Sequence, residues 1–171
     1  MDPILDKARA GQNVLEKIAN AIPGFKGYRE KELRRDTDRL QREHLSSLLE
    51  ECKRGLNEVS AAATRGGDLD VINDVETARK RLDKVVARIR YADRGYSGFF
   101  DAVKVDEAAL GRIYEFDLSL LDGVDAARVA AQDVAAAPAE RRKEALQALI
   151  ARVDALDARL ADREAILSGV R

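Results

Sequence analysis

The chain has 171 residues and a formal net charge of −1, so no overall electrostatic field steers it toward nucleic acid or anionic lipid. Charged residues make up 36% of it, against the roughly 25% of an average globular domain, and this composition favours long helices with exposed polar faces. The single cysteine excludes an internal disulfide, and the lack of an apolar run of about 18 residues or of a secretion signal predicts a cytoplasmic protein.

The first expected helix lies within residues 1–22. Pro3 suits a first helical position, and Pro23-Gly24 ends the segment. The apolar residues fall at spacings that share one helical face: Ile4, Ala8, Leu15, Ile18 and Ile22. This pattern predicts an amphipathic helix followed by a glycine-rich hinge.

Residues 28–64 and 69–91 are expected to form a long, coiled-coil-like antiparallel hairpin. Their apolar positions follow heptad steps of three and four residues, and Gly66-Gly67-Asp68 supplies the turn between them. The first seam is Leu45, Leu49, Cys52, Leu56, Val59 and Ala63, and the second is Ile72, Val75, Ala78, Leu82, Val85 and Ile89. Before Leu45 the apolar positions slip by one residue, to Leu33, Thr37, Leu40 and His44. Such a slip either changes the local winding or turns the apolar face toward a different neighbour.

A second helical pair is expected over residues 105–136 and 138–168, with Pro138 between the two helices. The stripe of the first helix is Leu110, Ile113, Asp117, Leu120, Val124 and Ala127, and that of the second is Leu146, Leu149, Val153, Leu156, Leu160 and Leu167. Arg163 interrupts the last seam. Because apolar alternation at period two is absent, no strand is expected. The sequence thus predicts a single all-α domain, an antiparallel bundle of about five helices.

The four tyrosines and four phenylalanines are confined to two short regions of the chain. Phe25 and Tyr28 flank the first hinge, and the other six lie between residues 91 and 116. Both regions contain the pattern Gly-aromatic-x-Gly-aromatic, at residues 24–28 and 95–99. The returning helix 69–91 is shorter than helix 28–64, and residues 92–104 are long enough to close the difference. We therefore expect both aromatic regions at one end of the bundle.

These rings have two interpretations. They either fill the end of the bundle as core packing or form part of a binding surface, since aromatic residues and arginines are enriched at the centres of interfaces. Residues 79–94 favour a surface, because they hold seven basic residues against two acidic ones, a net charge of +5. The residues expected at this candidate interaction surface are Arg88, Arg90, Arg94, Tyr96, Phe99, Phe100, Phe25 and Tyr28.

Two segments resemble those of small uncharacterised bacterial helical proteins. They are Ile-Pro-Gly-Phe-Lys-Gly-Tyr-Arg-Glu-Lys-Glu-Leu-Arg-Arg-Asp and Arg-Tyr-Ala-Asp-Arg-Gly-Tyr-Ser-Gly-Phe-Phe-Asp-Ala-Val-Lys, together about a sixth of the chain. The resemblance is consistent with a helical protein and implies no activity.

Catalytic, cofactor and metal sites are not expected. His44 is the only histidine, so a two-histidine metal site within one chain is excluded. His44 and Cys52 are eight residues apart on one expected helix, about 12 Å, which is too far for a base and its nucleophile. Gly66-Gly67 lacks the Lys-Ser/Thr of a phosphate-binding loop. We interpret His44 as partly buried and Cys52 as a buried, inert thiol.

The sequence favours a non-enzymatic interaction or scaffold protein that binds a protein partner or itself. Heptad surfaces pair with other helices, and the overhanging start of helix 28–64 and the interrupted seam of helix 138–168 are expected to leave apolar stripes uncovered. The alternative is a peripheral protein that binds an anionic membrane or nucleic acid through its basic, aromatic end. No cofactor or small-molecule substrate is indicated.

Overall fold

The computed structural model describes residues 13–25, 31–91 and 107–167; within its helices, the side chains of 31–38, 107–110, 112 and 163–167 are not described. Residues 13–21 are helical. They are followed by α2 (Lys31–Gly66), α3 (Leu69–Tyr91), α5 (Glu107–Ala136), the short 3-10 helix η1 (Ala139–Arg141) and α6 (Arg142–Leu167). Across these three stretches there is no strand, and the expected all-α fold is confirmed.

Gly67 and Asp68 shape the turn between α2 and α3. Gly67 has a φ of 70°, in the left-handed region that residues with a Cβ rarely adopt. Because this angle is not that of a right-handed α-helix, α2 ends here. The Asp68 amide donates to the Ala63 carbonyl at 3.0 Å, and the Gly67 amide donates to the Thr64 carbonyl at 3.3 Å, as in a Schellman motif. Asp68 then begins α3, because its carboxylate accepts a hydrogen bond of 3.1 Å from the Val71 amide. The expected span of 69–91 for α3 is confirmed, whereas α2 extends two residues beyond its expected end at 64.

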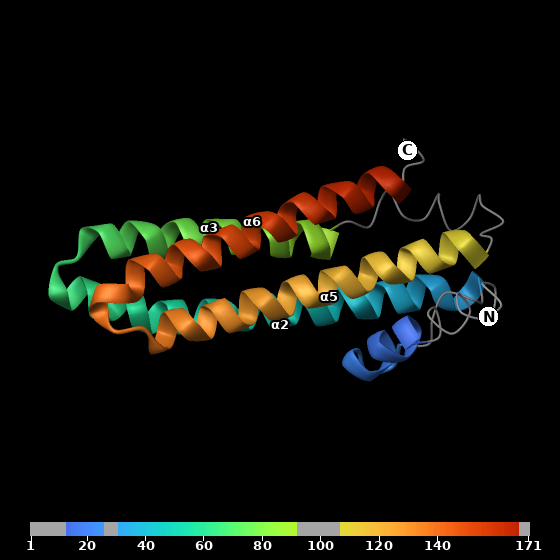
Figure 1. Cartoon of the computed structure of the whole chain (residues 1–171), viewed down its shortest axis with the longest axis horizontal. Helices are drawn as coiled ribbons and strands as arrows, with labels where there is room; N and C mark the ends of the chain where they lie inside the picture. The colour runs from blue at the N-terminus through green and yellow to red at the C-terminus, as the bar shows by residue number, and fades with distance from the viewer. Residues whose placement is uncertain (1–12, 26–30, 92–106, 168–171) are drawn as a thin grey trace, which may run out of the picture.

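The four long helices form a bundle of two hairpins (Figure 1). The first hairpin is α2 with α3 and the second is α5 with α6, and the helices of each hairpin run antiparallel. The hairpins meet through two further contacts, α2 with α5 and α3 with α6, and within each of these pairs the helices run parallel. Around the bundle the order is therefore α2, α3, α6, α5, which places α3 diagonally opposite α5.

One hydrophobic cluster runs through the bundle, and it contains nearly all the expected seam positions whose side chains are described. All six residues of the α2 seam between Leu45 and Ala63 are buried, as are the five of α6 between Leu146 and Leu160. In α3 the expected seam is wrong at one position, since Val71 is buried whereas Ile72 is half-buried, and Val86 is also buried. The stripe of α3 is wider than expected because this helix packs against both α2 and α6.

The register slip in α2 coincides with the end of α3. Lys53 contacts Asp83, and Asn57, four residues later, contacts Arg79, so the same antiparallel register places Tyr91 at the level of Leu45. Because α3 ends at Tyr91, the part of α2 that precedes Leu45 extends beyond the end of α3. Instead the first hinge approaches it, since a Cβ at Gly24 would lie 3.5 Å from Leu40 Cδ1. Leu40, at a slipped position, therefore faces the first hinge, whereas Gln41, four residues before Leu45, is fully buried.

Residues 13–25 thus cover part of the overhang of α2. Ile18, Ile22 and Phe25 are buried in the same cluster as the bundle core, and Val14 and Leu15 pack against it. Figure 1 shows this short helix beside the ends of α2 and α5, on the side away from α3 and α6. The expectation of an uncovered apolar stripe at the overhang is accordingly wrong for Leu40, which is half-buried against the hinge.

Candidate interaction surface

The structure describes three of the eight residues expected at the candidate interaction surface: Phe25, Arg88 and Arg90. The other five, Tyr28, Arg94, Tyr96, Phe99 and Phe100, lie outside the described residues, and their place in a surface stays a prediction.

The two aromatic regions meet, as the hairpin geometry predicts. Phe25 follows the first hinge and Tyr114 lies on α5, and their ring centroids are 6.4 Å apart at an interplanar angle of 63°. This edge-to-face arrangement is one that aromatic pairs prefer. Phe25 is only 8% exposed and Tyr114 only 7%. The assignment of Phe25 to an exposed surface is therefore wrong, because its ring fills the end of the bundle.

Arg88 is also engaged inside the molecule. Its guanidinium donates to the Asp157 carboxylate at 2.5 Å and to the Asp157 carbonyl oxygen at 2.8 Å, which links α3 to α6. Lys84 donates to the second carboxylate oxygen of Asp157 at 2.7 Å. Although partial burial acts to raise it, these two cations hold the pKa of Asp157 below its usual value. Arg88 thus bridges two helices, and only part of its side chain remains exposed at the candidate interaction surface.

Arg90 is more exposed than Arg88 but is also held within the first hairpin. Its guanidinium lies 3.7 Å from a Glu50 carboxylate oxygen on α2. The carbonyl oxygen of Arg90 accepts a hydrogen bond of 3.3 Å from the Arg42 guanidinium. About half of the Arg90 side chain is exposed, so it lies at the edge of the candidate surface while one side of it faces α2.

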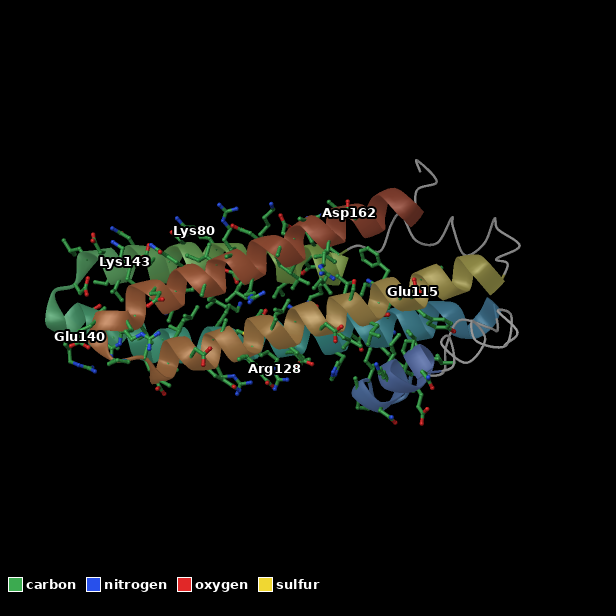
Figure 2. The ribbon with its side chains drawn as sticks, in the orientation of Figure 1. Lys80, Glu115, Arg128, Glu140, Lys143 and Asp162 are labelled. Carbon is green, nitrogen blue, oxygen red and sulfur yellow. The ribbon has the colours of Figure 1, made fainter. Side chains whose placement is uncertain are left out.

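The rest of the basic stretch on α3 is paired in the same way. Arg79 contacts Glu76 and donates to Asn57 at 2.6 Å, and Arg81 lies 3.2 Å from Asp154. Lys80 has no ion pair within the described parts of the chain, and it projects from the outer side of α3 (Figure 2). The net positive charge of this segment in the sequence is therefore largely balanced by carboxylates of α2, α3 and α6.

Tyr91 is the residue that the expected list missed. It is the last residue of α3 and is 76% exposed, the most exposed large hydrophobic residue in the parts that the structure describes. The others are Leu69, beside the Gly66-Gly67 turn, and Val129, in the C-terminal half of α5. The sequence contained the signal, because the α3 seam runs through Ile89 and a residue two positions later points away from that seam.

Buried polar residues also gather toward this end of the bundle. Gln41 and Asp117 are fully buried, and neither is without a partner. Gln41 lies 14 residues before Gly55 in α2, and Asp117 lies 14 residues before Ala131 in α5. A Cβ at Gly55 would lie 3.9 Å from the Ala131 carbonyl, so Gln41 and Asp117 lie at the same level of the parallel pair. Asp117 was expected on an apolar stripe, and its burial there is confirmed.

The lone cysteine and the lone histidine provide no reactive site. Cys52 is buried and its thiol donates weakly to the Leu48 carbonyl at 3.5 Å. Burial raises the pKa of the Cys52 thiol to about 11, which keeps it protonated and unreactive near neutral pH. His44 is half-buried, as expected. In the described stretches no group of three or more histidine, cysteine or carboxylate side chains is placed to hold a metal ion.

Among the described helices none has the length and apolar character needed to cross a bilayer. No family model, curated protein or solved structure matches the chain.

Proposed function

We propose that the chain is a non-enzymatic interaction or scaffold protein of the cytoplasm. In this proposal it binds a protein partner, or a second copy of itself, through the end of the bundle where α3 stops. The observation that carries the proposal is the exposure of Tyr91, which is 76% accessible at the end of α3 and directly precedes the segment holding Arg94, Tyr96, Phe99 and Phe100. A large exposed aromatic ring beside an arginine has the chemistry of an interface centre.

The other large apolar residues that are exposed do not form a comparable surface. Leu69 and Val129 are single exposed apolar residues on other parts of the bundle, and isolated residues of that kind are common on soluble proteins. Only Tyr91 adjoins a region where the sequence gathers further aromatic residues.

The alternative, binding to an anionic membrane or to nucleic acid, is less well supported. Its motivation was the basic stretch on α3, and five of the six basic residues between 79 and 90 have acidic partners. Charges that are already paired contribute little to attraction at long range. Lys80 is the exception among them, and one lysine is insufficient for tight binding to phosphates.

The test places a photo-reactive phenylalanine analogue at position 91, and at Val129 as the matched control. In cells that contain the natural partners, and separately with the pure protein, the Tyr91 position should give one discrete cross-linked product. The Val129 position should give none. Light scattering of the pure protein with Tyr91→Asp and Val129→Asp then separates self-association from binding to another protein. If both cross-linking positions behave alike, the proposed surface is wrong.

The alternative is tested with the unaltered protein and with Lys80→Glu. Sedimentation with vesicles containing phosphatidylserine, and a mobility shift with a short duplex DNA, should show no binding at low salt. Binding in either assay that decreases with added salt and with Lys80→Glu would instead favour an anionic ligand.

A further inference from the structure

The contact between α3 and α6 is lined by charged residues whose sign reverses along the helices. Near the start of both helices an acidic residue of α3 meets a basic residue of α6, since Asp70 lies 3.3 Å from Lys143. Farther along, basic residues of α3 meet acidic residues of α6. Arg81 lies 3.2 Å from Asp154, and Asp157 accepts hydrogen bonds from both Lys84 and Arg88.

These pairs share one register. Lys143 pairs with Asp70, and Asp157 pairs with Lys84. In both pairs the residue numbers differ by 73. Asp70, Thr77 and Lys84 are spaced by seven residues, as are Lys143, Ile150 and Asp157, so each set lies on one helical face. The register therefore places Thr77 opposite Ile150, midway between two ion pairs of opposite polarity.

Other arrangements of the same two hairpins would lose these pairs. If α5 lay beside α3 and α6 beside α2, the up-and-down directions would be kept, but Arg81, Lys84 and Arg88 would no longer face Asp154 and Asp157. If α6 instead packed antiparallel beside α3, its acidic part would approach Asp70, and Lys143 would approach the basic part of α3. Like charges placed opposite one another disfavour such a pairing.

We propose that this reversal of charge selects which helices of the two hairpins become neighbours and fixes the parallel register of α3 and α6. The apolar seams are built mainly from Leu, Val and Ala, and apolar side chains of this kind do not by themselves specify which helix becomes the neighbour. The ion pairs are partly exposed and individually weak. Together, however, they favour the observed arrangement of the helices over the others, because only this arrangement places opposite charges next to each other. In coiled coils, charged residues beside the apolar seam determine the partner and its orientation in the same way.

The experiment uses a disulfide to report the register. In the full chain with Cys52→Ala, the substitutions Thr77→Cys and Ile150→Cys place two thiols opposite each other across α3 and α6. The first test variant adds Asp154→Lys and Asp157→Lys. The second adds Arg81→Asp, Lys84→Asp and Arg88→Asp to the first, which restores opposite charges with exchanged sign. The matched control adds Asp133→Lys and Asp162→Lys, the same change of charge at two exposed residues without ion pairs to α3 among the described residues.

The expected result is efficient intramolecular disulfide formation in the parent and the control, loss of it in the first variant, and recovery in the second. Circular dichroism monitors helix content throughout. If the first variant forms the disulfide as readily as the parent, the proposal is wrong. If the first variant does not fold, the second must regain both its helices and its disulfide, and failure to do so also overturns the proposal.

Discussion

Replacing Gly55 by alanine should stabilise the protein, because the glycine occupies the interior of α2 at the contact with α5. A glycine in a helix interior is less favourable than alanine by about 1 kcal/mol. The added Cβ would lie 3.6 Å from the Cβ of Ala135 and 3.9 Å from the Ala131 carbonyl oxygen, which are ordinary van der Waals contacts. No neighbour has to move, so the full gain of about 1 kcal/mol in the free energy of unfolding is expected.

Gly123 provides a matched comparison in α5. It is also interior to its helix, but an added Cβ would lie only 3.1 Å from Leu156 Cδ1 on α6. Leu156 is buried, so it has little space into which to move. Overpacking of about 1–3 kcal/mol then offsets the helix gain, and Gly123→Ala should be neutral or destabilising by up to about 2 kcal/mol.

Thermal unfolding followed by circular dichroism measures both variants. For a chain of this length a gain of about 1 kcal/mol corresponds to a rise in Tm of about 2–4 °C. Urea unfolding gives the free energies independently, provided that the slope with denaturant is unchanged. A fall in Tm for Gly55→Ala, or equal rises for both variants, would refute the arrangement of small residues at these two helix contacts.

Three further predictions concern single residues. Ser46→Ala should raise the free energy of unfolding by about 1–2 kcal/mol in urea titrations, because the Ser46 hydroxyl is buried without a hydrogen-bond partner among the described residues, whereas Ser47→Ala at its exposed neighbour should change it less. Gly67→Ala should lower Tm, since a φ of 70° costs a residue with a Cβ about 1–2 kcal/mol. The stability advantage of the parent over Cys52→Ala should be constant below pH 9 and decrease as the pH rises toward 11. The reason is that burial raises the pKa of the Cys52 thiol from 9.0 to about 11, so the unfolded chain loses this proton first. After allowance for water reaching the thiolate, the expected decrease is about 1–2 kcal/mol, and a difference that does not depend on pH would contradict it.

Local sequence signals were enough to locate the described helices. The Gly66-Gly67-Asp68 turn set the start of α3 to the residue, because its glycine conformation and its aspartate cap act within a few positions of one another. The seam of α2 was equally local, since heptad spacing requires only one helix. The end of α5 at Ala136, two residues before Pro138, follows from the restriction that proline places on the preceding backbone.

The sequence alone did not show which segments, far apart along the chain, contact one another. The basic stretch of α3 indicated a surface for anions, but its partners Asp154 and Asp157 lie on α6 and were not distinguishable from other exposed carboxylates. The burial of Phe25 depends on Tyr114, which is 89 residues away in the sequence. The parallel pairing of the hairpins could not be derived from heptads either, because an apolar seam favours a neighbour without specifying which one.

The parallel pairing also has a consequence for the order of folding. Each hairpin joins helices that are adjacent in the sequence, whereas the ion pairs of Lys84 with Asp157 and of Lys143 with Asp70, which link the hairpins, join residues 73 positions apart. Contacts of long sequence separation carry a larger loop-closure cost and form late. We therefore expect the hairpins to form first and to dock last, with the ion pairs of Asp157 made after the rate-limiting barrier. Weakening those pairs should then leave the refolding rate nearly unchanged and speed unfolding, so the charges along α3 and α6 would control how long the assembled bundle persists.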